Sequence, residues 1–291
     1  MKLNHLPRHK RALRAWIRKR ECRGFTLDES ETRLPRQRGK VRHLLSLYSS
    51  NTKNGRQLQT WHLSASMHPT EARRNGAGDG PICGDCPFRG PLCYVNGQGL
   101  GSLHKSWERG NYPLFSEAAR DIGLSMPQAL RVLGTLADGV RLGAYGDPCA
   151  MDPAIARALV GSADTRQGFT HAWRDFGGTP WQGLIMASCE LPEQVGKAAA
   201  AGWRTFTVYP PELSEAQARQ AIARASGRQV LAHCPASARK GYSAACDTCP
   251  IQCDGVREGS PWHVLNAAHG SPHTLARFRS AGYLEKWSRY L

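Results

Sequence analysis

The feature that most limits the fold is an alternation of short strand-like and helix-like stretches from residue 58 onward. Strand patterns cover residues 58–64, 140–147, 167–173, 183–188, 203–209 and 229–233. Helix patterns of about ten to fifteen residues lie between them. Strands separated by such helices form βαβ units, whose strands are parallel. The sequence therefore predicts an α/β fold, and its roughly six units predict a partial or irregular (β/α) barrel.

Helix starts support this interpretation. Ser125 precedes a helix expected over 127–137, and Asp152 with Pro153 opens another helix, because a polar cap followed by proline is a typical first turn. Ser214 and Gln217 form a capping box for a helix to about residue 225. Further helices are expected over 100–110, 114–122, 192–201, 262–268 and 272–282.

Polar residues stand where the predicted strands end. In open α/β sheets and barrels, function gathers at the carboxyl ends of the strands. We therefore take Asp147, His171, Tyr209 and His233 as candidate catalytic residues, and Ser64 as a candidate cofactor contact. Asp147 also has a simpler interpretation, because Gly-Asp-Pro favours a turn.

A first group of cysteines follows the first predicted strand, with the spacing Cys83-x2-Cys86-x6-Cys93. Two thiols at Cys-x2-Cys spacing can bind one metal centre, because a short turn directs both sulfurs the same way. Three thiolates leave one position of a four-iron cluster open. The alternatives are zinc, with His62, His68 or His104 as its fourth ligand, and no bound metal.

A second group consists of Cys234, Cys246, Cys249 and Cys253. Four thiols can close a metal site completely, and closed sites are usually structural. Zinc and an auxiliary iron–sulfur cluster both fit these ligands. Seven of the ten cysteines thus fall in two groups with metal-type spacing, which indicates bound metal in a reducing compartment, the cytoplasm, rather than a disulfide framework.

Positive charge is concentrated near the N-terminus. The chain carries a net charge of +16, and its first 42 residues contain fourteen Lys or Arg against four acidic residues. Such asymmetry predicts contact with a polyanion, here DNA or RNA, and a solvated basic surface is the alternative. The candidate nucleic-acid contacts lie in an expected basic helix over 1–24: Arg11, Arg14, Arg18, Lys19 and Arg20.

Three segments follow from these patterns. Residues 1–57 are expected to form a basic helical arm and linker, with a polar linker over 25–35 and a second helix over 36–49. Residues 58–233 form the predicted partial barrel with the cysteine loop 83–93, and residues 234–291 a cysteine-rich metal-binding segment with C-terminal helices. No apolar run of about 18 residues predicts a membrane span, and no apolar core follows the basic N-terminus, so no secretory signal is expected.

The stretches 61–94 and 141–148, together with the second cysteine group, resemble an uncharacterised cysteine-cluster family common in bacteriophage genomes, which implies the cytoplasm of a host cell. More distantly, a cysteine loop after the first strand of an α/β barrel resembles the radical-SAM enzymes. That resemblance implies a [4Fe–4S] cluster on Cys83, Cys86 and Cys93, with S-adenosylmethionine on the open iron. The intervals of two and six residues differ from the usual radical-SAM spacing.

Three functions remain open from the sequence. The first is an iron–sulfur enzyme, in the radical-SAM resemblance an S-adenosylmethionine-dependent one, that modifies a nucleic acid or nucleotide. The second is a zinc-containing barrel that exchanges or modifies a base, as transglycosylases do, with Asp147 as its carboxylate. The third is a zinc-stabilised protein that binds nucleic acid without catalysis.

Overall fold

The computed structural model describes residues 6–49, 52–76, 78–95, 97–237, 240–241, 243–255 and 263–291. The strands are β1 (Gly24–Glu31), β2 (Lys40–Ser46), β3 (Gln57–Ser64), β4 (Gly139–Tyr145), β5 (Thr165–Thr170), β6 (Met186–Cys189), β7 (Thr205–Tyr209), β8 (Leu231–His233) and β9 (His263–Ala267). The α-helices are α1 (Leu6–Arg20), α2 (Pro69–Asn75), α3 (Gly80–Cys83), α4 (Gly97–Glu108), α5 (Phe115–Asp121), α6 (Met126–Gly134), α7 (Pro153–Val160), α8 (Pro192–Ala200), α9 (Glu215–Ser226), α10 (Pro272–Ser280) and α11 (Tyr283–Ser288). Short 3-10 turns are η2 (Thr52–Asn54), η3 (Gly90–Leu92), η4 (Pro148–Ala150) and η5 (Pro180–Gly183).

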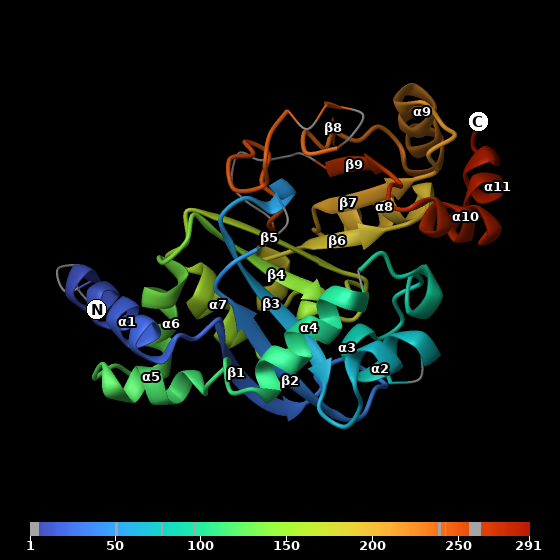
Figure 1. The fold of residues 1–291 in the computed structure, drawn as a ribbon. Coiled ribbons are helices and arrows are strands. Elements are labelled where there is room, and N and C mark those ends of the chain that lie inside the picture. The colour runs from blue at the N-terminus through green and yellow to red at the C-terminus, as the bar shows by residue number, and fades with distance from the viewer. Residues whose placement is uncertain are drawn as a thin grey trace.

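The nine strands form one sheet in the order β1-β2-β3-β4-β5-β6-β7-β9-β8 (Figure 1). The pairs β1·β2 and β2·β3 are antiparallel, and every pair from β3 to β8 is parallel. The predicted α/β fold with parallel strands is therefore confirmed. The sheet runs from β1 at one edge to β8 at the other, and no hydrogen bonds between these two described strands close it into a ring.

Two apolar layers cover the sheet. The main core lies between one sheet face and helices α1, α5–α9 and α11, and it contains Trp16, Phe115, Leu142, Ala187 and Trp287. A smaller core packs α3 and α4 on β2–β4, through Leu63, Ile82, Leu100 and Tyr145. The smaller core covers only β2–β4, and the same face of the following strands lines the cavity described below. No helix in the described part of the chain is both long and apolar enough to cross a membrane.

Three predicted elements are wrong. The segment 36–49 contains β2 rather than a helix, and the expected linker 25–35 contains most of β1. The segment 262–268 contains β9, which enters the sheet between β7 and β8 rather than forming a helix. The expected helical arm is therefore helical only in α1, and the residues after it add two antiparallel strands to the parallel sheet.

A pair of buried histidines joins the antiparallel strands β2 and β3. His43 and His62 lie opposite each other in register, and their Nδ1 atoms are 2.8 Å apart. Both side chains are inaccessible to solvent. Burial lowers the pKa of His43 from 6.5 to about 4, and burial followed by the charge of His43 lowers the pKa of His62 well below 6.5. Both imidazoles are therefore neutral near pH 7, and one donates a hydrogen bond to the other.

We expect this pair to make the fold sensitive to acid. Between about pH 4 and about pH 6.5 the unfolded chain binds protons on these histidines that the folded chain does not bind. The free energy of unfolding is therefore highest above this window and falls as pH falls through it. For His43 alone the difference in pKa corresponds to about 3 kcal/mol of unfolding free energy. Urea unfolding at several pH values measures how the free energy of unfolding changes with pH. His43→Gln should reduce this pH dependence relative to the wild type. An unchanged pH dependence would contradict the role of the histidine pair.

Candidate active site and metal centres

One face of the parallel strands forms the floor of a cavity of about 420 Å³, which we call the inner cavity. Successive side chains of a strand point to opposite faces, so alternate residues reach this floor. They are Arg141 and Gly143 of β4, Gln167 and Phe169 of β5, Ser188 of β6, Phe206 and Val208 of β7, and Asn266 of β9. The intervening residues, such as Leu142 and Ala187, pack in the main core on the other face. Residues Leu275 and Phe278 of α10 also line the inner cavity.

The first cysteine group lines this cavity. Cys83 ends α3, Cys86 lies in the following turn, and Cys93 ends the short turn η3. Burial, and then the neighbouring Cys86 thiol, raises the pKa of Cys83 well above its ordinary value. Burial also raises the pKa of Cys93. Arg73 donates to the carbonyl oxygen of Cys93 (2.8 Å) and fixes the backbone there.

The carboxyl end of β4 holds the cysteine loop in place. The hydroxyl of Tyr145 donates to Asp79 Oδ1 (2.7 Å), just before α3, and the backbone N–H of Asp147 donates to the carbonyl oxygen of Ile82 (2.6 Å). Gly146 has a φ of +80°, and a Cβ there would lie 2.7 Å from the Cβ of His62 and 3.1 Å from the oxygen of Ile82. Only glycine permits this approach without displacement of a neighbour. The Gly-Asp-Pro turn therefore positions the loop that carries the thiols.

The carboxylate of Asp147 accepts three hydrogen bonds from neighbouring residues. One carboxylate oxygen accepts from the backbone N–H of Cys149 (3.0 Å), and the other accepts from Thr170 Oγ1 (2.9 Å) and from the N–H of His171 (3.0 Å). Burial raises its pKa above the ordinary value. The residue lines the inner cavity, but these three hydrogen bonds make it a fixed link between the ends of β4 and β5.

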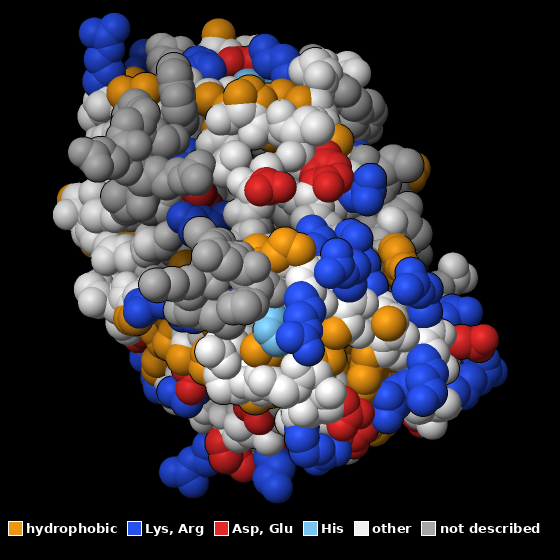
Figure 2. Space-filling model, turned by 90° about the vertical axis from the view of Figure 1, so that its left-hand side faces the viewer, with side chains coloured by type: hydrophobic (Ala, Val, Ile, Leu, Met, Phe, Trp, Pro, Cys, Tyr) orange, Lys and Arg blue, Asp and Glu red, His pale blue; other side chains and the backbone are white. Residues whose placement is uncertain are grey.

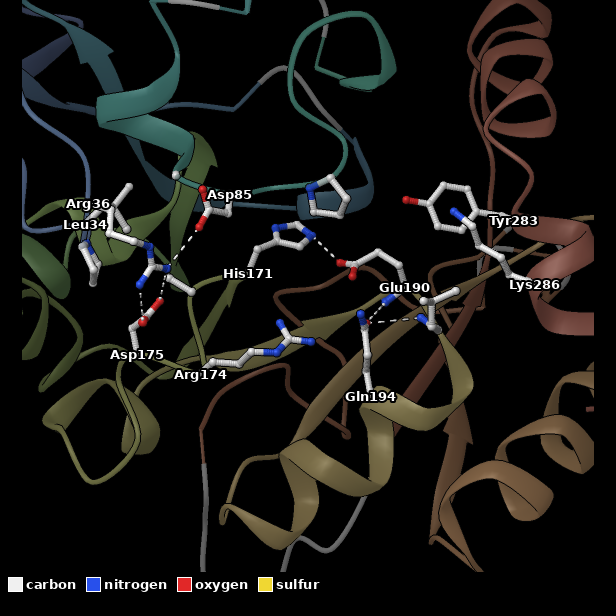
Figure 3. A pocket seen from close by; sticks show the side chains of 15 residues that line it. Leu34, Arg36, Asp85, His171, Arg174, Asp175, Glu190, Gln194, Tyr283 and Lys286 are labelled. Carbon is white, nitrogen blue, oxygen red and sulfur yellow. Dashed lines mark hydrogen bonds and ion pairs between the residues drawn. The ribbon is translucent and has the colours of Figure 1, made fainter.

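His171 lies at the wall between the inner cavity and a second hollow of about 530 Å³, which we call the rim pocket. Its Nε2 is 3.9 Å from the sulfur of Cys86 and 2.7 Å from Oε1 of Glu190, which follows β6. Burial alone would lower the pKa of His171, but its interactions with Cys86 and Glu190 outweigh burial and raise the pKa well above its ordinary value. Figure 3 shows His171 directed toward Glu190 across the rim pocket.

Charged side chains border the rim pocket. Arg36, from the turn before β2, donates to both Asp85 of the cysteine loop and Asp175 after β5 (Figure 3). Arg174 and Lys286 also line the pocket, and Tyr283 of α11 stands beside Lys286. The rim pocket therefore brings together loops at the carboxyl ends of β5 and β6, the cysteine loop and α11.

The second cysteine group also lines the inner cavity, with Cys234 just after β8 and the other three cysteines in the loop that follows. Cys234, Cys246 and Cys253 line the cavity, and Cys249 is buried behind them. The N–H of Cys246 donates to the oxygen of Lys53, before β3, and the N–H of Gly168 donates to the oxygen of Cys253. Burial, and then the other three thiols, raises the pKa of Cys253 well above its ordinary value.

A buried carboxylate holds this second segment on the sheet. Asp254 accepts from Arg204 (2.8 Å) and from Arg166 (3.1 Å), which stand at the starts of β7 and β5. Arg204 also donates to the backbone oxygens of Ile251 and Gln252. Both cysteine groups thus contribute to the lining of one cavity, an arrangement that their separation of more than 140 residues in the sequence does not reveal.

The donor geometry differs from that of a single-ion site. All ten cysteines are free of disulfides. Within the described residues, no three His, Cys, Asp or Glu side chains are gathered closely enough to hold one metal ion. The three histidines considered as zinc ligands, His62, His68 and His104, do not line the inner cavity: His62 is paired with His43, and the rings of His68 and His104 pack together at 4.5 Å.

No protein-family model, curated protein or solved structure matches this chain. The assignment of the site therefore rests on its own residues.

Three of the predicted site residues lie away from the cavity. Tyr209 projects into the main core, and its hydroxyl lies 3.0 Å from Nε2 of His233 on the same side of the sheet. Ser64 pairs with Ser66 at the end of β3 (3.2 Å). None of the three lines the inner cavity or the rim pocket. A strand-end position does not specify the face toward which a side chain points.

Glu190, Arg141 and Asn266 line the site but were not among the predicted residues. Glu190 follows Cys189 at the end of β6, so the strand-end rule could have found it. Asn266 belongs to β9, which the sequence pattern assigns to a helix, and no local signal points to it.

The five candidate nucleic-acid contacts all lie on α1. Leu13 and Trp16 bury one side of this helix, while Arg11, Arg14, Arg18, Lys19 and Arg20 are exposed. Arg20 also stacks over the Trp16 ring and lies 3.5 Å from Asp121. Figure 2, which views the side on which α1 lies, shows many Lys and Arg side chains and fewer acidic ones. The helix is amphipathic, so its charges form an exposed stripe on the folded body.

Proposed function

We propose that this chain is an iron–sulfur enzyme that modifies a nucleotide or nucleic acid. Cys83, Cys86 and Cys93 would hold a [4Fe–4S] cluster with one iron open toward the inner cavity. The observation that carries the proposal is that both cysteine groups line the same cavity, on one face of a parallel sheet. Residues of β4–β7 and β9 all line this one cavity, which supports describing the sheet as a partial barrel.

The donor set fits an iron–sulfur cluster. It consists of thiols, which are the usual ligands of such clusters. In a cluster each cysteine binds a different iron, so the sulfurs need not converge on one point as they must around a single ion. We propose that Cys234, Cys246, Cys249 and Cys253 hold a second, auxiliary cluster by the same argument. Ten unpaired thiols support a reducing compartment, the cytoplasm.

When bound, a cluster with an open iron can supply electrons to a small molecule on that iron, which in the radical-SAM resemblance is S-adenosylmethionine. The chain's own residues orient and shield the reactants. Phe169, Phe206 and Phe278 line the inner cavity with apolar surface that excludes water. His171, with its Nε2 3.9 Å from the sulfur of Cys86, would donate a hydrogen bond to that sulfur when it binds the cluster.

The aromatic lining and the Arg141 guanidinium support a nucleotide or nucleic acid as the substrate, because bases stack on aromatic rings and phosphates attract cations. The exposed cations of α1 provide further phosphate contacts on the surface. The zinc-dependent base-exchange alternative would use Asp147 for proton transfer. Its three protein hydrogen bonds favour a positioning role instead.

Metal analysis of protein purified without oxygen tests the proposal. We expect a brown protein with broad visible absorbance that bleaches on reduction, and about four to eight iron atoms per chain, depending on whether the second centre survives purification. Zinc should be present only in trace amounts. A colourless, iron-free protein that carries stoichiometric zinc would exclude the proposed enzyme class.

A further inference from the structure

The inner cavity contains one buried polar group that its neighbours do not satisfy. Asn266, on β9, is 6% exposed, and its Oδ1 has no hydrogen-bond partner among the described residues. Its Nδ2 lies 3.5 Å from Nδ1 of His269, a ring nitrogen that is also 3.1 Å from the backbone oxygen of Ala267. Burial lowers the pKa of His269, so the ring is neutral. If Nδ1 donates to Ala267, it cannot accept from Asn266, and both polar atoms of the amide are available to a ligand.

This unpaired amide has an energetic cost. A buried polar group without a partner loses its hydration and gains nothing in return, which amounts to about 1–3 kcal/mol. The cost does not depend on which way the amide is turned, because either orientation leaves one polar atom without a partner. A ligand in the cavity that forms a hydrogen bond with Asn266 would remove this free-energy cost.

Aromatic rings stand beside the amide. Phe169 and Phe206 project from β5 and β7 with ring centroids 4.5 Å apart, and both line the inner cavity. Val208 pairs with Asn266 in register, and Phe206 lies two residues before Val208, so the aromatic pair and the amide share one face of the sheet. A flat ring stacked on Phe206 would present its edge toward Asn266.

We propose that Asn266, Phe169 and Phe206 form a nucleobase subsite, which binds the base of the substrate to be modified. The side-chain amide offers one donor and one acceptor, which pair with adjacent ring-nitrogen and exocyclic-amine groups, as Asn does with the N7 and N6 groups of adenine. The base therefore presents an amine donor next to a ring-nitrogen acceptor, as adenine and cytosine do. The subsite rests on the proposed function, because it assigns the substrate of that same cavity.

The experiment uses the full chain, purified without oxygen with its metal. Calorimetric titration with AMP, CMP and ribose 5-phosphate measures whether a base is required. We expect AMP or CMP to bind and ribose 5-phosphate, which has no base, to bind at least about tenfold more weakly. Asn266→Leu and Phe206→Leu should each weaken nucleotide binding by about tenfold or more.

Two further measurements separate recognition from stability. Asn266→Leu removes an unsatisfied buried group, so its melting temperature should equal or exceed that of the wild type even though binding weakens. The matched control is Asn111→Leu, whose amide contacts Ser106 outside both hollows, and it should leave binding unchanged. A destabilised Asn266→Leu protein that binds nucleotides normally would overturn the subsite.

The possible failures are distinguishable. If the protein contains iron but binds no nucleotide, the subsite is wrong and the iron–sulfur proposal stands. If nucleotides bind through Asn266 in an iron-free zinc protein, the subsite stands and the enzyme class is wrong. If S-adenosylmethionine alone depends on Asn266 and nucleotides do not bind, the residue serves a cofactor, and the assignment to a substrate base is overturned.

Discussion

Replacing Cys83, Cys86 and Cys93 together with alanine is expected to remove about four iron atoms per chain and the corresponding share of the visible absorbance. The three thiols line the inner cavity and are the proposed ligands of the open cluster. Iron bound by the second group should remain, because its four thiols come from a different segment of the chain and are not replaced. Iron content and absorbance of protein purified without oxygen measure both effects.

The control for this variant is Cys22→Ala. Cys22 is buried in the main core, and its thiol contacts the oxygen of Ile17 (3.6 Å), so it has no part in either cysteine group. Its iron content should equal that of the wild type. The reciprocal variant, with Cys246 and Cys249 replaced by alanine, should lose only the iron bound by the second cysteine group. A triple Cys83/Cys86/Cys93 variant that keeps all its iron would show that these thiols are not ligands.

Replacing Asp254 with asparagine should destabilise the fold by about 3–5 kcal/mol. Its carboxylate is inaccessible to solvent and joins Arg166 and Arg204, and its loss leaves buried positive charge without compensation. Because Arg204 also holds the backbone of residues 251–254, the second cysteine group should lose metal at the same time. Urea unfolding and iron content measure the two consequences.

Asp85→Asn is the matched control for that substitution. Asp85 pairs with Arg36 at 3.1 Å, but both side chains are mostly exposed, and exposed pairs contribute about 0–1 kcal/mol. The same change of carboxylate to amide should therefore have little effect on the unfolding free energy. Equal effects of the two substitutions would mean that burial does not govern the contribution of Asp254.

Much of the parallel sheet could be predicted from local patterns, because helix caps and short apolar runs mark its units. The capping box of Ser214 and Gln217 and the proline after Asp152 are present as expected. The sequence pattern of β2 predicts a helix for a physical reason. Leu44 packs in the smaller core and Leu45 in the main core, so both faces of the strand are buried and the alternation that identifies strands is absent.

The site was predictable only in part. The cysteine spacing indicated thiol groups, and His171 followed from the ends of parallel strands. The convergence of the two groups could not be predicted, because it depends on β9 inserting between β7 and β8 against the sequence order. The same insertion places Asn266 beside Val208, a contact between residues far apart in the sequence.

Phe88, within the first cysteine loop, packs against Phe278 of α10 and Tyr283 of α11, with ring centroids 5.9 and 5.6 Å away. These partners leave the ribosome long after the loop itself. The loop therefore gains these contacts only after α10 and α11 have been synthesised, and under the proposed function cluster insertion would be a late step in biogenesis. Under the same proposal, a chain that ends before α10 would lack these ring contacts and should hold less iron than the full chain.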